Sequence, residues 1–191
     1  TSLDQRLVSY QRDRLMAVYL AKAGYSRALA EIERDLTPTV DSYLDPWAHN
    51  PEAFQGATLG QGNFTVSYSL PGEGSDGGVY GVVDEDRKIN INTASKAVLV
   101  KLPGMTEEIA DSLQVWRDKI ELGKIKDKRF KVLEDLLLVE GMTGEVFQAL
   151  QPFITVYTDG KVNVNTAPQE VLKALGMGEG LVNKLLRFRR G

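Results

Sequence analysis

The longest helical pattern in the chain runs from Leu3 to Leu36. This stretch has no proline, and its apolar residues recur every three or four positions, interrupted only at Arg14. At 1.5 Å per residue, the predicted amphipathic helix would be about 50 Å long. Its stripe consists of Leu3, Leu7, Tyr10, Val18, Ala21, Tyr25, Ala28, Ile32 and Leu36. Either the helix only packs on a sheet, or its N-terminal half projects and also contacts other subunits.

Alternation of apolar and polar residues begins after a loop without periodicity. Residues 37–57 contain three proline turns, whereas residues 63–70 alternate strictly and predict a strand. Its inward face would carry Phe64, Val66, Tyr68 and Leu70. Residues 71–78 read as a loop and residues 79–92 as further strand, which together predict an antiparallel meander beside the long helix.

A repeated phrase joins strand to helix at two places. Lys-Ile-Asn-Ile-Asn-Thr-Ala at residues 88–94 returns as Lys-Val-Asn-Val-Asn-Thr-Ala at residues 161–167. In each copy a helical pattern follows the threonine, so we expect Thr93 and Thr166 to be N-caps, the latter in a capping box with Gln169. The phrase therefore predicts a strand, a cap, a helix and then a hairpin.

The region between the two copies is predicted to be helical. Helical patterns cover residues 94–102, 106–120, 130–139 and 146–150, and residues 152–156 read as a strand. We expect three parts: residues 1–92 with the helix and strands, an inserted helical domain at 93–152, and residues 153–191 with return strands and a third hairpin unit. The fold class is therefore α+β. A start at Thr1 and a stop after Arg-Arg-Gly predict a fragment with an incomplete C-terminus.

Composition narrows the classes of function. The chain has 191 residues, of which 42% are hydrophobic and 26% charged, as in ordinary globular proteins. The absence of cysteine excludes thiol, disulfide and zinc-thiolate chemistry and leaves the compartment open. Residues 161–191 hold six basic and two acidic residues, a net charge of +4, so the first 160 residues carry −7 of the total of −3. That acidic part does not favour contact with nucleic-acid phosphate.

No set of residues predicts catalysis or a resident cofactor. His49 is the single histidine, and the chain shows no nucleophile with a base and no phosphate loop. One cluster offers oxygen ligands but lacks the spacing of an EF-hand loop: Glu73, Asp76, Asp84, Glu85 and Asp86. A solvated edge is the favoured interpretation of this cluster, with calcium binding as the alternative.

Gly-Met pairs at residues 104–105, 141–142 and 176–177 each lie between two helical patterns. The hairpins predicted at these pairs resemble tandem helix-hairpin-helix modules of competence-type DNA receptors. Those modules use a Gly-hydrophobic-Gly hairpin that brings backbone N–H groups to a phosphate. At Gly104 and Gly141 the second glycine is replaced by threonine, and carboxylates follow that would repel phosphate. We therefore interpret these two hairpins as structural.

The third hairpin keeps the glycine pair, at Gly176 and Gly178. It is followed by the basic residues Lys184, Arg187, Arg189 and Arg190. A structural hairpin is favoured over a phosphate site here. A DNA-binding module built from residues 176–190 nevertheless remains the rival hypothesis from another functional class.

A second resemblance covers nearly the whole chain. Four features carry it: Leu-Ala-Lys-Ala-Gly-Tyr-Ser-Arg-Ala-Leu at residues 20–29, the Asp-Pro-Trp loop at 41–48, the strand at 64–68 and both Asn-x-Asn-Thr-Ala phrases. Together they resemble the minor pseudopilin K family of type II secretion systems. The resemblance implies a pilin-like long helix on an antiparallel sheet with a large helical insertion. It also implies a non-enzymatic subunit at the pseudopilus tip, joined to minor pseudopilins I and J.

The same resemblance implies a periplasmic domain whose inner-membrane anchor is absent from this chain. Related proteins imply calcium as well, but no ligands can be matched. Our leading hypothesis is an assembly subunit whose helix contacts its neighbours through Leu3, Leu7, Tyr10 and Val18, whereas nucleic acid is not favoured as a partner.

Overall fold

The computed structural model describes residues 2–37, 39–69, 78–121 and 129–189 of an α+β chain. The chain divides into two compact units, Thr1–Val83 and Asp84–Gly191. The predicted boundaries at residues 92 and 152 stay a prediction. No helix of the described residues is both long and apolar enough to cross a membrane.

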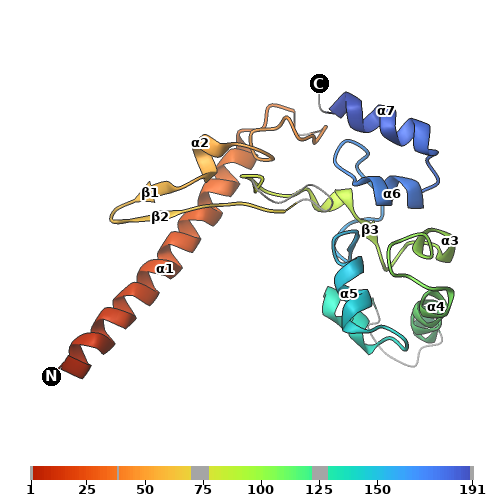
Figure 1. Ribbon diagram of the computed structural model, residues 1–191, viewed down its shortest axis with the longest axis horizontal. Helices are drawn as coiled ribbons and strands as arrows, with labels where there is room; N and C mark the ends of the chain where they lie inside the picture. The colour runs from red at the N-terminus through yellow and green to blue at the C-terminus, as the bar shows by residue number, and fades with distance from the viewer. Residues whose placement is uncertain (1, 38, 70–77, 122–128, 190–191) are drawn as a thin grey trace. The chain divides into compact units, whose positions relative to one another are not determined.

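The first unit is a long helix with a short antiparallel hairpin against it (Figure 1). Helix α1 spans Ser2–Glu33 and is followed by the single turn α2, Pro51–Phe54. Strands β1, Ala57–Leu59, and β2, Gly62–Phe64, pair with Ala57 opposite Phe64. An isolated bridge between Tyr68 and Val79 extends the antiparallel arrangement.

Two glycines let the hairpin approach α1 closely. A Cβ atom added at Gly24 would lie 3.3 Å from side-chain atoms of Phe64 and Val66, and one at Gly62 would overlap Leu20. Ala28 and Phe54 are buried beside this crossing and form a small core together with Ala53. The hairpin therefore packs closely against the C-terminal part of α1, at positions where glycine leaves no side chain between the two.

The buried face of α1 differs from the predicted stripe. Of the stripe residues after Val18, Ala28 is buried, whereas Tyr25 and Ile32 are exposed. Gly24 and Glu31 lie on the side that faces the protein. The stripe did not predict the buried face because a small residue, rather than a large apolar one, is needed where a strand crosses a helix.

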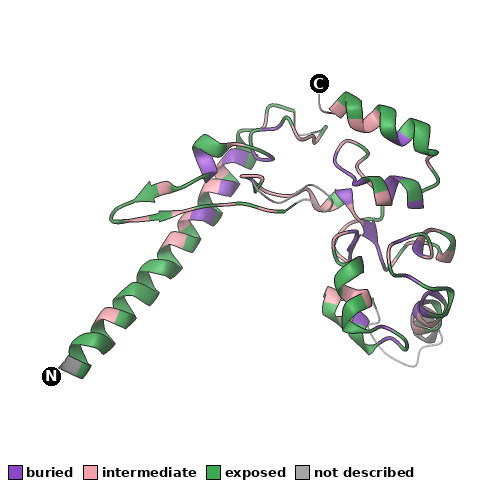
Figure 2. Cartoon of the chain, in the orientation of Figure 1, coloured by how far each residue is buried: buried purple, intermediate pink, exposed green. Residues whose placement is uncertain are grey.

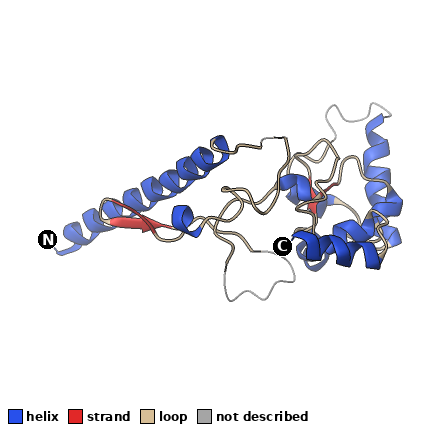
Figure 3. Ribbon diagram, turned by 90° about the horizontal axis from the view of Figure 1, so that it is seen from above, coloured by secondary structure: helices blue, strands red, loops and turns tan. Residues whose placement is uncertain are grey.

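The second unit is mostly helical around one core (Figure 3). Its strands are β3, Ile89–Asn90, and β4, Ile154–Thr155, which pair in parallel with Ile89 opposite Ile154. Between the strands come α3, Lys96–Leu99, α4, Glu107–Glu121, the 3-10 helix η2, Leu133–Leu138, and α5, Gly144–Leu150. After β4 follow α6, Gln169–Ala174, and α7, Glu179–Arg189.

The predicted strands are shorter than the alternation suggested. Within residues 79–92 only the Val79 bridge and β3 have strand geometry, and the 3-10 helix η1, Glu85–Arg87, interrupts them. The alternation at 63–70 yields β2 and the bridge at Tyr68, while Leu70 lies outside the described residues. Alternation marks which residues can pair, but pairing also needs a partner strand at the right distance.

Candidate functional site

The N-terminal half of α1 presents apolar side chains to solvent. Figure 2 shows this half of the helix almost entirely exposed. The four residues proposed as a partner interface, Leu3, Leu7, Tyr10 and Val18, are each between 45% and 76% exposed. Because a soluble helix normally buries its large apolar side chains, this surface is a candidate interface. Its role in binding stays a prediction.

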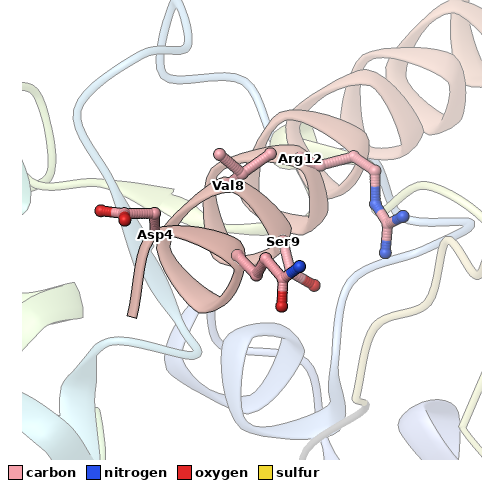
Figure 4. A pocket seen from close by; sticks show the side chains of 5 residues that line it. Asp4, Val8, Ser9 and Arg12 are labelled. Carbon is pink, nitrogen blue, oxygen red and sulfur yellow. The ribbon is translucent and has the colours of Figure 1, made fainter. Parts of the chain in front are cut away.

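A depression in the surface lies on the same half of α1 (Figure 4). It is lined by Asp4, Gln5, Val8, Ser9 and Arg12. All five residues belong to one helix, so the depression does not enclose a small molecule. Val8 is a further exposed apolar residue beyond the predicted stripe, and Leu15 and Tyr19 share that property.

Three aspartates gather in the loop after α1. Carboxylate oxygens of Asp35, Asp41 and Asp45 lie within 4.8 Å of one another, a set that could ligate a cation such as calcium. Backbone N–H groups also bind this cluster: Thr37 donates to Asp35 at 2.8 Å and lowers its pKa, and Ser42 donates to Asp45 at 2.6 Å. The sequence interpretation missed this cluster, although three aspartates around an Asp-Pro-Trp turn were a visible signal.

The acidic cluster named from the sequence is organised differently. Glu73 and Asp76 lie outside the described residues. Asp84 accepts hydrogen bonds from the Thr166 hydroxyl at 2.5 Å and from the Asn163 amide at 2.9 Å. This carboxylate therefore holds the second copy of the repeated phrase in place.

The first two hairpins pack against each other reciprocally. Gly104 adopts φ +78° and a Cβ there would lie 3.3 Å from Ala149 of α5. Gly141 adopts φ +85°, and a Cβ there would lie 3.2 Å from Ile109 of α4. Each hairpin glycine thus faces a helix of the other hairpin, and both positions need a left-handed backbone conformation.

The helices after these hairpins are capped by their own threonines. The Thr106 hydroxyl accepts from Ile109 N at 3.2 Å, and the Thr143 hydroxyl accepts from Val146 N at 3.2 Å. Hydrogen bonding to the backbone and to Thr106 also lowers the pKa of Glu108, which favours its negative form. A phosphate at the start of α4 would meet an N–H already bonded and a carboxylate.

The third hairpin is open. Gly176 has φ +95°, and a Cβ at Gly176 or at Gly178 would have no heavy atom of the described residues within 4 Å other than those of the glycine and its two chain neighbours. Lys184 and Arg187 are exposed on α7, and Arg190 lies outside the described residues. This hairpin is therefore the most accessible of the three.

The repeated phrase forms the same turn in both copies, and its threonines are not N-caps. The side chain of Asn90 accepts from Asn92 N at 2.8 Å, and that of Asn163 accepts from Asn165 N at 3.0 Å. In each copy the carbonyl of the first asparagine accepts from the N–H of the alanine, at 2.9 and 3.0 Å. These bonds close a tight turn ahead of the helix.

The helices begin later than predicted. Ser95 is the N-cap of α3 and Pro168 that of α6, so the predictions for Thr93 and Thr166 and for a capping box with Gln169 were wrong. The physical reason is that two residues still separate each threonine from the first helical residue, beyond the reach of a cap. The Thr166 hydroxyl donates to Asp84 instead.

An arginine holds each turn from the end of the following helix pair. Arg117 donates to the carbonyls of Ala94 at 2.7 Å and Ile91 at 3.4 Å. Arg189 donates to the carbonyls of Ala167 at 2.6 Å and Val164. The second arginine had been counted among the basic residues of a phosphate site, but its guanidinium is bound to the backbone of its own repeat.

Sequence comparison identifies the helix-hairpin-helix element. Residues 84–155, which are less than half of the chain, match the helix-hairpin-helix motif family. The zebrafish endonuclease/exonuclease/phosphatase family domain-containing protein 1 is 28% identical over an alignment 129 residues long, which covers 56% of this chain. Its human counterpart is 27% identical over an alignment 141 residues long, which covers 57% of this chain. The chain spans under a quarter of the length of these relatives, at 22% and 23%.

Comparison of structures identifies the fold. The crystal structure of the GspK–GspI–GspJ complex from the enterotoxigenic Escherichia coli type 2 secretion system matches with a TM-score of 0.62 and 17% identity. The match covers 93% of this chain and 72% of that one. At this identity the likeness shows the fold, and the chain is therefore α+β with a long N-terminal helix in a pseudopilin-like arrangement that contains helix-hairpin-helix units.

Proposed function

We propose that this chain is the periplasmic domain of a minor pseudopilin, an assembly subunit at the tip of a type II secretion pseudopilus. It would be non-enzymatic, anchored in the inner membrane in its full-length form, and joined to the minor pseudopilins I and J. The observation that carries the proposal is the likeness over 93% of the chain to a protein of a complex of three pseudopilus proteins.

The exposed half of α1 supplies the interaction surface in this proposal. Its large apolar side chains face solvent in the isolated chain, and burying one such side chain against a partner contributes about 1.5–3 kcal/mol. Partner helices would pack along Leu3, Leu7, Tyr10 and Val18, as amphipathic helices pack in an apolar groove. The acidic balance of the first 160 residues is compatible with protein partners and disfavours nucleic acid.

Binding to purified minor pseudopilins I and J tests the proposal. We expect Leu7→Glu and Val18→Glu each to weaken the complex at least about tenfold, because a carboxylate would be buried in an apolar contact. Gln5→Glu is the matched control, since it adds the same charge at an exposed polar position on the side of α1 opposite Leu7. Equal affinity of all three variants would remove α1 from the interface, and no binding by the native chain would refute the proposal.

A DNA-binding module is the second candidate. It is favoured by the helix-hairpin-helix match and by the open Gly176 hairpin with Lys184 and Arg187 nearby. The capped and acidic first two hairpins oppose it, as does the binding of the Arg189 guanidinium to the backbone carbonyl of Ala167.

A gel-shift titration with duplex DNA separates the two candidates. We expect no shift at physiological salt. A shift that Arg187→Glu abolishes and that Lys161→Glu leaves unchanged would instead establish the Gly176 hairpin as a DNA site. Lys161 is a suitable control because its side chain is exposed.

A further inference from the structure

The two copies of the phrase belong to two longer structural repeats. Residues 88–117 form the first repeat and residues 161–189 the second, and they differ in length by one residue, at Pro103. Each runs from the asparagine turn through two helices to the arginine that binds that turn. Their inner sides match, since Ala110 in the first repeat and Val182 in the second are both fully buried.

The outer faces of the two repeats differ. Ile109 of α4 is 5% exposed, whereas its counterpart Leu181 of α7 is 58% exposed. Trp116 is half-buried and stacks on Phe130 with ring centroids 5.9 Å apart, whereas its counterpart Phe188 is 85% exposed. The second repeat therefore shows to solvent the positions that the first repeat covers.

Residues 129–150 are the cover of the first repeat. Phe130 lies under Trp116, and its backbone N–H and carbonyl bind the side chain of Asn92 at 2.9 and 3.1 Å. The glycine hairpin that follows packs Gly141 against Ile109. The cover thus consists of a buried aromatic residue followed by a helical hairpin with a glycine at its turn.

We propose that the outer face of the second repeat, lined by Leu175 directly after α6 and by Leu181 and Phe188 of α7, is a docking surface for a segment with the chemistry of residues 129–150. A partner subunit supplies that segment, so the inference rests on the proposed function as an assembly subunit. The three lining side chains are between 43% and 85% exposed, and among the described residues none covers them as residues 129–150 cover the first repeat.

Charge favours an acidic occupant of this surface. Lys184 lies on α7 between Leu181 and Phe188, at the three- and four-residue spacings that place side chains on one helical face. The position of Lys184 in α7 corresponds to Ser112 in α4. The cover of the first repeat contains four acidic and two basic residues, and a segment of that composition would complement the lysine better than it complements α4.

The docking surface is tested with the complete chain and the purified minor pseudopilins I and J. We expect Leu181→Glu and Phe188→Glu each to raise the Kd for one of the two partners at least about tenfold. Asn183→Glu is the control, because it places the same charge on α7 at an exposed position away from the docking face. Circular dichroism of all variants checks that the helices stay folded. A synthetic peptide of residues 129–150 serves as a defined probe and should compete with that partner.

Each outcome decides the inference. Partner binding that is unchanged in both variants overturns the docking surface and leaves the proposed function standing, whereas no partner binding by the native chain refutes both. Weaker binding in the variants without competition by the peptide overturns the stated occupant. A change in self-association of the isolated chain, measured by sedimentation, would make a second copy the occupant and would also overturn the proposal.

Discussion

The two structural repeats share one local structure but differ in what covers their outer faces. Both use the asparagine turn, a glycine hairpin and a closing arginine, and both bury the same inner positions. The first repeat is closed on its outer side by residues 129–150, and the second is open there. The shared bonds therefore specify the repeat itself, while the covering segment decides whether its outer helix belongs to a core or to a surface.

The largest difference between the two repeats should come from truncating one apolar side chain on the outer face of each. Ile109→Ala removes a buried side chain and leaves a cavity beside Gly141, so we expect a loss of about 2–5 kcal/mol in the free energy of unfolding. Leu181→Ala, at the equivalent exposed position, should change it by at most about 0.5 kcal/mol. Urea unfolding measures both. Equal losses would mean that the second repeat is covered in solution.

A smaller and equal effect is expected at the two closing arginines. Lysine cannot reproduce two directed hydrogen bonds from a planar guanidinium, so Arg117→Lys and Arg189→Lys should each cost about 1–2 kcal/mol. The similarity of the two losses, again from urea unfolding, is the critical result. A cost at Arg117 alone would show that the closing contact of the second repeat contributes no stability in solution.

The smallest effect concerns the carboxylates beside the second repeat. Burial, aided by the negative charges of Asp84, Asp159 and Glu85, raises the pKa of Asp86, whose carbonyl accepts from Asn163 N. A carboxyl group whose pKa is raised by folding contributes stability at a pH below its pKa in the unfolded chain. This contribution is lost as the pH rises through its pKa in the folded chain. Asp86→Asn should therefore be more stable than the native chain at neutral pH, with the gain disappearing below the ordinary aspartate pKa.

Asp159→Asn should have the opposite sign. The backbone N–H of Lys161 holds the pKa of Asp159 below its usual value, so this carboxylate stabilises the fold above the unfolded pKa and ceases to do so as the pH falls through the folded value. The variant should be less stable than the native chain at neutral pH. Unfolding midpoints measured between acid and neutral pH test both residues, and a common sign would contradict the assignment.

The sequence was sufficient for features that depend on local chemistry. The absence of proline predicted α1, and the structure ends this helix at Glu33, three residues before the predicted end. The glycines at positions 104, 141 and 176 coincide with left-handed turns, which few other residues adopt. The α+β class followed from an alternating segment and a helical segment in one chain.

Features that depend on distant partners could not be read from the sequence. The Thr166 hydroxyl binds Asp84, a residue 82 positions earlier, and no local rule selects this partner over a capping role. The aspartates at positions 35, 41 and 45 meet because a loop folds back on itself. The uncovered outer face of α7 was also hidden, since Leu181 and Phe188 have the same apolar character as their buried counterparts.

In each repeat the arginine contacts link the last residues of the repeat to its first turn. The guanidinium at the last turn of a repeat holds the carbonyls at its first turn, so the two ends can separate only if both bonds break together. Segments joined in this way tend to open as one cooperative unit rather than fray from an end. The arginine contact is thus supplied from within each repeat, whereas the contact of Phe130 with the first turn and that of Asp84 with the second come from outside the repeats.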